Sequence, residues 1–316
     1  MTGFQDRIMS VASAFHGLSA FPPTPADKDG RVDTEALCRL LERLCDAGVA
    51  SIGLLGSTGI YAFLTCEERR RAVEAAVECV RGRVPLVVGV GALRTDHARS
   101  LARDAEAAGA DALLLAPVSY TPLTQDEAYE HFLAVTEVAK LPLCIYNNPG
   151  TTHFTFSRDL LQRLSDIETI RAVKMPLPVD GDFAGELATL REKTKLAIGY
   201  SGDWGAAEAL LSGADAWYSV IGGMLPRVAL ALTRAAIAGE GGEARRLDGL
   251  LEPLWQTFKA FGSLRVVYTL VDLLSLAGAE LPRPLLPLGP MDRQRVLEAV
   301  EPLIALESEL KPQSLL

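Results

Sequence analysis

The alternation of short apolar runs with longer amphipathic segments constrains the fold more than any other feature of this sequence. Eight apolar runs occur between residues 17 and 222, and the segments between them carry apolar residues at spacings of three and four. The runs cover residues 17–21, 50–56, 85–91, 110–117, 141–147, 170–176, 195–202 and 214–222. This alternation is typical of βα units, and three junctions repeat the same order of helix, glycine and apolar strand.

Eight βα units in roughly 200–250 residues predict an α/β fold, the (β/α)8 TIM barrel. The rival fold is a doubly wound open sheet, whose usual glycine-rich phosphate loop is replaced here by PPTPADKDG after the first run. After Gly242 the pattern becomes wholly helical, which predicts two or three added helices. We therefore expect residues 1–240 to form the barrel and residues 241–316 to form a C-terminal helical extension packed on it.

The composition argues against several classes of protein. The 316 residues carry a formal net charge of −9, and no segment gathers Lys and Arg, so we expect no nucleic-acid partner. The sequence has no signal-like N-terminus and no window of about 18 uncharged apolar residues, so we expect a cytoplasmic protein without a membrane partner. The five cysteines form no CxxC pair and the four histidines are scattered, so we expect reduced thiols and no metal site.

A lysine near the end of the sixth apolar run, IRAVKMP, points to chemistry. Parallel strands of a barrel are covered on both faces, so an inward Lys174 would be partly desolvated, which disfavours its charged form. A neutral amine attacks a ketone to form a Schiff base, and the protonated Schiff base withdraws electrons from the adjacent carbon–carbon bond. The alternative is that the side chain extends past the end of the strand into water.

Other polar residues also follow the predicted strands. In a barrel the carboxyl ends of the strands face one cavity, so Ser57, Thr58 and Tyr146 would lie near Lys174. Each has an ordinary structural alternative, because Ser and Thr are common in turns and a tyrosine at a strand end often packs at the rim. We expect Asp203, after the seventh run, to cap the helix that follows it.

Four short segments resemble, in order and spacing, the dihydrodipicolinate synthase and N-acetylneuraminate lyase family of pyruvate-dependent class I aldolases; they are GLLGSTG (53–59), YNNPG (146–150), AVK (172–174) and YSGD (200–203). The resemblance implies an eight-fold barrel, no metal or organic cofactor, and a homotetramer built from two tight dimers. It also implies that Lys174 is the Schiff-base lysine, that Tyr146 relays protons, and that Ser57 and Thr58 hold the carboxylate of a 2-keto acid.

Several positions depart from the pattern of that family. Ile60 stands where the family commonly has Glu. Thr151 lies where the synthases have an arginine that binds the carboxylate of the second substrate. Either Tyr120 or Ser119 lies where the synthases send a tyrosine into the neighbouring subunit. We expect Tyr120, Thr151 and Ser219 to contribute to the substrate site.

We therefore predict a Schiff-base lyase or aldolase that acts on pyruvate or a longer 2-keto acid. Threonine offers no charged fork to a carboxylate, so we expect hydroxylated keto acids, in sugar-acid catabolism, rather than aspartate semialdehyde, unless Arg94 compensates. The alternatives are 4-hydroxy-tetrahydrodipicolinate synthase proper, a non-catalytic metabolite-binding barrel, and an isomerase that binds a phosphate group at Gly222 and Gly223.

Overall fold

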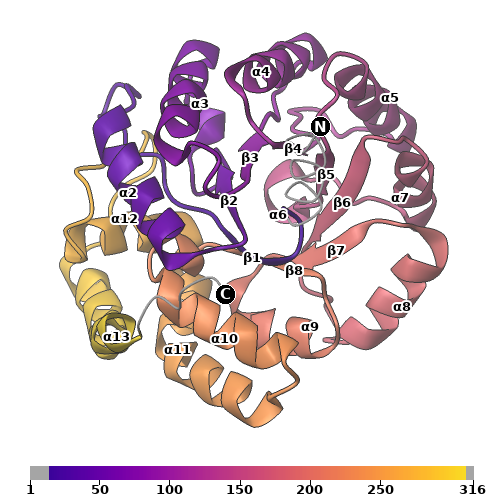
Figure 1. The fold of residues 1–316 in the computed structure, drawn as a ribbon. Helices are drawn as coiled ribbons and strands as arrows, with labels where there is room; N and C mark the ends of the chain where they lie inside the picture. The colour runs from indigo at the N-terminus through magenta and orange to yellow at the C-terminus, as the bar shows by residue number, and fades with distance from the viewer. Residues whose placement is uncertain (1–13, 311–316) are drawn as a thin grey trace.

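The computed structural model describes residues 14–310. Eight parallel strands in sequence order close into a barrel, because β1 pairs with both β2 and β8 (Figure 1). The strands are β1 (Gly17–Ala20), β2 (Ser51–Leu54), β3 (Leu86–Gly89), β4 (Ala112–Leu115), β5 (Leu143–Tyr146), β6 (Ile170–Met175), β7 (Ala197–Tyr200) and β8 (Ala216–Ser219). The predicted barrel and the eight strand positions are confirmed, and each strand ends before its apolar run does.

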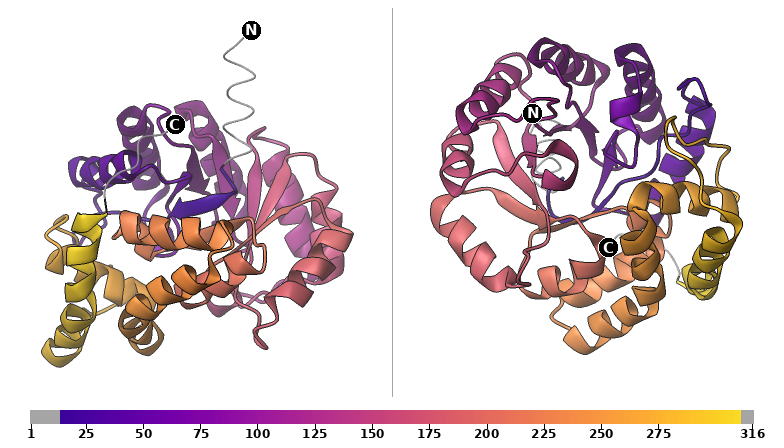
Figure 2. Two further views of the ribbon diagram at one scale, coloured as in Figure 1. Left: turned by 60° about the horizontal axis from the view of Figure 1, so that its bottom comes forward. Right: turned by 180° about the vertical axis from the view of Figure 1, so that it is seen from behind.

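Amphipathic helices surround the barrel (Figures 1 and 2). They are α2 (Thr34–Ala47), α3 (Cys66–Val80), α4 (Thr95–Ala108), α5 (Gln125–Thr136), α7 (Arg158–Ser165), α8 (Phe183–Lys193), α9 (Ala206–Leu211) and α10 (Pro226–Ile237). The short turn α6 (Pro149–Thr152) lies inside this ring (Figure 1), and the 3-10 turns are η1 (Tyr61–Phe63), η2 (Asp203–Gly205) and η3 (Ile221–Gly223). Local sequence sets several of their ends. Thr124 and Glu127 form a capping box at the start of α5, and Gly48 ends α2 in the left-handed conformation.

Three further helices lie together on one side of the barrel, beside α10 (Figures 1 and 2). They are α11 (Gly241–Phe261), α12 (Ser263–Leu273) and α13 (Pro290–Glu309), so the predicted C-terminal helices are confirmed. Leu254 and Trp255 of α11 and Val300 of α13 are completely buried. They belong to the same apolar cluster as Leu232 of α10, and the division of the chain at residue 240 stays a prediction.

The barrel has two apolar layers because successive strand residues face opposite sides. On β6, Ala172 belongs to the inner cluster, whereas Val173 belongs to the larger cluster between the strands and the helices. On β8, Tyr218 lies in the inner cluster and Trp217 in the outer one. The same alternation turns Lys174, two residues after Ala172, toward the barrel interior.

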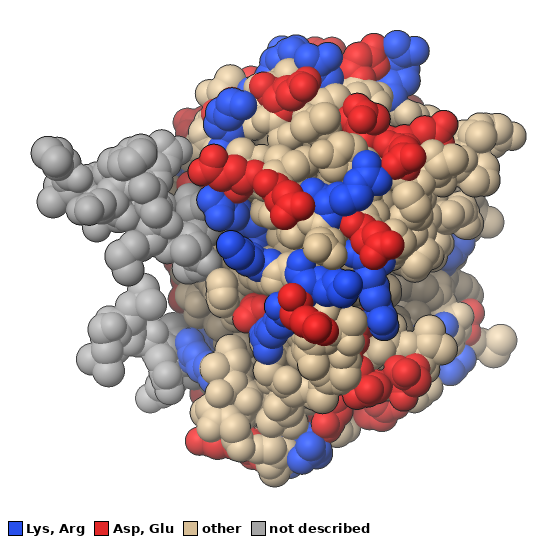
Figure 3. Space-filling model, turned by 90° about the vertical axis from the view of Figure 1, so that its right-hand side faces the viewer, with Lys and Arg blue, Asp and Glu red and all other residues tan. Residues whose placement is uncertain are grey.

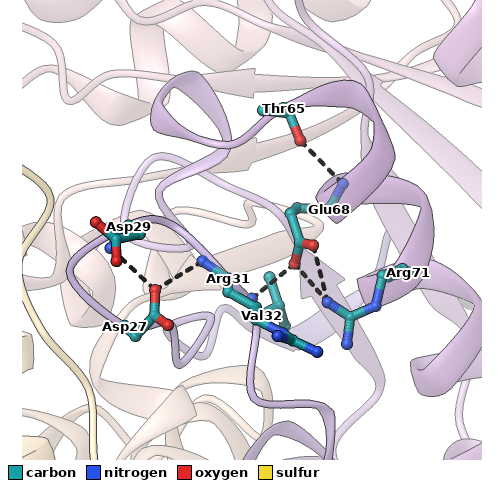
Figure 4. A network of polar contacts seen from close by, with 7 residues as sticks. All are labelled: Asp27, Asp29, Arg31, Val32, Thr65, Glu68 and Arg71. Carbon is teal, nitrogen blue, oxygen red and sulfur yellow. Dashed lines mark hydrogen bonds and ion pairs between the residues drawn. The ribbon is translucent and has the colours of Figure 1, made fainter.

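A polar network links the loop after β1 to the start of α3 (Figure 4). The Glu68 carboxylate accepts hydrogen bonds from the Val32 N–H and from Arg71 Nη1, both at 2.7 Å. Thr65 caps the helix, since its hydroxyl oxygen accepts the Glu68 N–H at 3.2 Å. These bonds anchor the far end of the segment that connects β2 to α3.

Acidic and basic side chains are interspersed on the face that carries α5, α7 and α8 (Figure 3). An ion pair of 2.8 Å between Arg163 and Asp126 joins α7 to α5 there. This mixture differs from the uniformly basic surface that binds a phosphate backbone. Between residues 14 and 310, no helix combines the length and the apolar character needed to cross a membrane.

Candidate active site

Lys174 lies inside the barrel, and only 3% of its surface is exposed. Its Nζ is 3.9 Å from the centroid of the Phe21 ring, 4.2 Å from that of Tyr146 and 5.7 Å from that of Tyr218. These rings come from the end of β1, from β5 and from β8. The amine is thus enclosed by aromatic side chains, whose faces attract a cation.

Tyr146 is the register partner of Lys174 on the neighbouring strand β5. Its hydroxyl lies 3.1 Å from Ser57 Oγ and accepts a hydrogen bond from Asn148 Nδ2 at 2.9 Å. The structure therefore brings Lys174, Tyr146 and Ser57 together from three strand ends, as the barrel arrangement requires.

The turn after β2 that carries Ser57 and Thr58 has an unusual backbone. Leu55 before the turn and Ile60 after it have positive φ angles of 57° and 52°. The left-handed region is unfavourable for such side chains, above all for the β-branched Ile60. The Ile60 N–H donates to the Ser57 carbonyl at 3.2 Å and closes the turn, while Thr58 is buried.

Three residues predicted for the substrate site make no contact with Lys174 in this chain. Ser219 is completely buried, and its hydroxyl accepts the N–H of Gly222, a residue of η3, at 2.8 Å. Its neighbour Tyr218 faces the interior, so Ser219 faces away from Lys174. Tyr120 is 96% exposed, and Thr151 is exposed on α6. The structure does not join these three side chains to Lys174, and their part in substrate binding stays a prediction.

Arg94 is engaged by a neighbouring acid. Its guanidinium donates to both carboxylate oxygens of Asp96, at 2.9 Å and 2.7 Å, and both side chains are exposed. Hydrogen bonding to the carboxylate is the main cause that raises the pKa of Arg94. In this arrangement the pair of N–H donors with which Arg94 could bind a substrate carboxylate already binds Asp96.

The prediction that Asp203 caps the helix after it was wrong. The Asp203 carboxylate is 2% exposed and accepts hydrogen bonds from Trp217 Nε1 at 2.9 Å, from the Ile221 N–H at 2.8 Å and from the Val220 N–H at 3.2 Å. Burial raises its pKa, although the three donors oppose this effect. Asp203 therefore fixes the loop after β8. Its partners are distant in sequence, so no local pattern indicated them.

Sequence reasoning also missed a second tyrosine near Tyr146. Tyr61 of η1 is buried, its ring lies 5.3 Å from the Arg69 guanidinium carbon, and burial, followed by the effect of Tyr146, raises its pKa. Arg69 is 4% exposed and donates to the carbonyls of Gly89 and Gly91. Burial lowers the pKa of Arg69 to about 10. A buried guanidinium thus supports the tyrosine ring.

Possible metal ligands are scattered over the described part of the chain. Between residues 14 and 310, no group of three or more His, Cys, Asp or Glu side chains is placed to hold a metal ion. All five cysteines are free thiols, and Cys144 lies inside the barrel with its sulfur 3.5 Å from the Tyr218 hydroxyl.

The sequence profile of the Dihydrodipicolinate synthetase family matches residues 14–303. The chain belongs to this family. A 4-hydroxy-tetrahydrodipicolinate synthase of Alkalilimnicola ehrlichii is 32% identical over 289 residues, which cover 91% of this chain and 98% of the relative. The predicted family is confirmed, and with it the enzyme class, a lyase of the class I aldolase type.

Solved structures of the family agree with this assignment. A crystal structure of dihydrodipicolinate synthase from Agrobacterium tumefaciens is 63% identical, with a TM-score of 0.91, and the match covers 93% of this chain and 99% of that one. A dihydrodipicolinate synthase from Acinetobacter baumannii, solved in complex with pyruvate, is 29% identical with a TM-score of 0.84 and coverages of 94% and 100%.

Proposed function

We propose that the chain is a Schiff-base lyase whose substrate is pyruvate or a longer 2-keto acid. The observation that carries this proposal is the buried Lys174 amine beside a tyrosine hydroxyl, that of Tyr146, which is itself bonded to Ser57 at 3.1 Å. An enclosed amine paired with a proton donor is what carbinolamine formation and dehydration require. The family relative from Acinetobacter baumannii that was solved with pyruvate supports the choice of a keto acid.

In this mechanism Lys174 Nζ attacks the ketone carbon and forms a carbinolamine. Tyr146 gives its proton to the carbinolamine oxygen, water leaves, and an iminium ion remains on Lys174. The iminium accepts the electron pair of the C3–C4 bond when that bond breaks, the C4 hydroxyl gives its proton to the Tyr146 phenolate and leaves as an aldehyde carbonyl, and an enamine remains on Lys174. Ser57 and Thr58 hold the substrate carboxylate through their hydroxyls and backbone amides.

The aromatic rings around Lys174 serve the same intermediate. Their faces stabilise a nearby cation, and the contribution is largest where water is excluded. Phe21 and Tyr218 would therefore favour the iminium ion over the neutral carbinolamine. The rings thus stabilise the charge of the intermediate, whereas Tyr146 donates and accepts the protons.

We propose that the preferred substrate is a hydroxylated keto acid, which is split in the aldol direction or dehydrated, with sugar-acid catabolism as the setting. Thr151 supplies no guanidinium, and Arg94 is paired with Asp96. Both threonine hydroxyls donate to the Asn148 carbonyl, Thr152 at 2.9 Å and Thr151 at 3.4 Å, so the exposed Thr151, with the longer bond, is the hydroxyl more readily turned to a substrate. The second candidate is 4-hydroxy-tetrahydrodipicolinate synthase proper, which the names of the curated relatives favour.

A steady-state comparison separates the two candidates. Pyruvate with aspartate semialdehyde is compared with a panel of keto-deoxy sugar acids, in the wild type and in Thr151→Arg. We expect the wild type to prefer a sugar acid and Thr151→Arg to gain semialdehyde condensation, because a guanidinium restores the charged fork. A wild-type kcat/KM of about 10⁴ M⁻¹s⁻¹ or more for the semialdehyde would instead establish the synthase.

We also propose that the chain acts in the cytoplasm as a homotetramer of two tight dimers. The family resemblance supports this assembly, because Tyr120 or Ser119 lies where the synthases send a tyrosine into the neighbouring subunit, and the 96% exposure of Tyr120 leaves its ring free for such a contact. Sedimentation velocity tests the assembly. Tyr120→Ala should weaken it, and a wild-type monomer at enzyme concentrations that support turnover would contradict it.

A further inference from the structure

The Tyr146 hydroxyl has two polar neighbours that play different parts. Asn148 Nδ2 lies 2.9 Å from the Tyr146 oxygen, and Ser57 Oγ lies 3.1 Å from it. An amide nitrogen can only donate, so the Asn148 contact uses the tyrosine oxygen as an acceptor. Either hydroxyl of the Tyr146–Ser57 pair can donate, and because Asn148 uses the tyrosine oxygen only as an acceptor, the single phenol proton is free to be donated to Ser57 Oγ.

We propose that Asn148 is a positioning residue, which directs the Tyr146 proton toward Ser57 and stabilises the phenolate once the proton has left; this inference rests on the proposed Schiff-base function. Hydrogen bonds then run in one direction, from Asn148 to Tyr146 and from Tyr146 to Ser57. The hydroxyl proton of Ser57 is left to donate to the substrate carboxylate.

The backbone around Asn148 makes its side chain a rigid donor. Its carbonyl accepts the N–H groups of Thr151 and Thr152, both at 3.0 Å, and the Thr152 hydroxyl at 2.9 Å. Pro149 follows at the start of α6 and fixes its own φ angle. A donor held in place before the reaction stabilises developing charge without reorganisation. The short turn α6 therefore ties the tyrosine hydroxyl to the rim of the barrel.

Asn148 acts in the two steps in which Tyr146 first loses and then regains its proton. Once the carbinolamine is present, Tyr146 gives its proton to the carbinolamine oxygen instead of sharing it with Ser57 and becomes a phenolate, and its bond from Asn148 becomes charge-assisted and stronger. The phenolate then takes a proton from C3 of the pyruvate iminium, which becomes the enamine, and the phenol is restored. Both transfers are reversible, so in D2O the C3 hydrogens of pyruvate exchange for deuterium.

This exchange is followed by NMR with pyruvate alone, and Schiff-base formation is followed by borohydride trapping at equilibrium. In Asn148→Leu we expect exchange to slow by about 10- to 100-fold, the effect of one lost hydrogen bond to a charged group, while trapping at Lys174 persists. Asn148→Asp keeps the shape of the side chain but accepts a hydrogen bond instead of donating one. It should also slow exchange by about 10-fold or more.

Asn147→Leu is the matched control. Asn147 is buried, its Nδ2 faces Met175 Sδ at 3.6 Å, and its side chain has no bond to Tyr146. A positioning role predicts that the pH profile of exchange changes shape in the Asn148 variants and keeps its shape in Asn147→Leu. A purely structural role of Asn148 would lower exchange by the same factor at every pH, and that result would overturn the inference.

The outcomes also separate the inference from the proposed function. Wild-type protein that neither exchanges nor is trapped overturns the proposed function and the inference with it. Wild-type protein that does both, with wild-type exchange in Asn148→Asp and in Asn148→Leu, overturns the inference alone. Circular dichroism establishes that each variant is folded, and the isosteric Asp variant provides the test if the Leu variant does not fold.

Discussion

Replacement of Gly89 by alanine tests how the turn that carries Ser57 is held in place. Gly89 is the last residue of β3, and a Cβ atom there would lie 2.0 Å from the Leu55 carbonyl oxygen and 2.9 Å from the Leu55 carbonyl carbon. Both atoms belong to the backbone, so no change of rotamer relieves the clash. Leu55 already has a positive φ angle of 57°, which leaves its backbone little freedom.

The expected loss of activity in Gly89→Ala follows from the 2.0 Å between the added Cβ atom and the Leu55 carbonyl oxygen. A Cβ contact closer than about 3.0 Å does not occur in practice, so the Leu55 carbonyl and β3 must separate by about 1 Å. Leu55 lies two residues before Ser57, so the shift also displaces the Ser57 hydroxyl, which lies 3.1 Å from the Tyr146 hydroxyl. A displacement of about 1 Å in a reacting group costs about 10²-fold in rate. Overpacking should also lower the free energy of unfolding by about 1–3 kcal/mol.

The assay measures the rate of pyruvate exchange in D2O and, in parallel, thermal unfolding of Gly89→Ala. Gly249→Ala is the matched control, because Gly249 is exposed on α11 with no atom within 4 Å of the added carbon. The control should keep the wild-type exchange rate and gain up to about 1 kcal/mol in stability from helix propensity. A folded Gly89→Ala protein with the wild-type exchange rate would refute our account of the turn.

Two further predictions concern Asp203 and Phe21. Asp203→Asn places an amide NH2 group against the three N–H donors that now bind the carboxylate. The free energy of unfolding in urea should fall by about 1–3 kcal/mol, and an unchanged value would show that these hydrogen bonds do not stabilise the fold. Because burial raises the pKa of Asp203 above its ordinary value of 3.8, the folded state binds more protons than the unfolded state above that pH, and the contribution of this group to stability falls as pH rises through the folded pKa. This slope should disappear in Asp203→Asn, and an identical slope in both proteins would show that another group causes it. Phe21→Leu removes the ring 3.9 Å from Lys174 Nζ and should weaken pyruvate trapping by about 3- to 30-fold in a titration, whereas unchanged trapping would exclude a role for the ring.

The barrel could be predicted from sequence because its signal is repeated eight times and depends only on local periodicity. An error at one strand end does not alter the count of βα units. The placement of Lys174 followed from the same periodicity, since the alternation on β6 sets its direction once Ala172 faces inward. Those parts of the site that lie at strand ends of a parallel barrel could therefore be derived from the sequence.

The parts that failed depend on contacts between distant segments. Asp203 accepts hydrogen bonds from donors 14 to 18 residues away, on β8 and in the loop after it, and the local pattern suggested only a helix cap. The hydroxyl of Ser219 accepts the Gly222 N–H, a contact that cannot be told from substrate binding in sequence alone, and its predicted part in the site stays a prediction. Asn148 carried no signal of its own, because its function depends on where its amide points.

Borohydride reduction in the presence of pyruvate tests whether Lys174 is the nucleophile. We predict that the peptide containing Lys174 gains the mass of one reduced pyruvyl group, and that Lys174→Arg, which keeps the charge but cannot form the Schiff base, gains none. An unmodified Lys174 peptide with pyruvate and with a panel of longer 2-keto acids would contradict the Schiff-base mechanism, as would stoichiometric labelling of a different lysine.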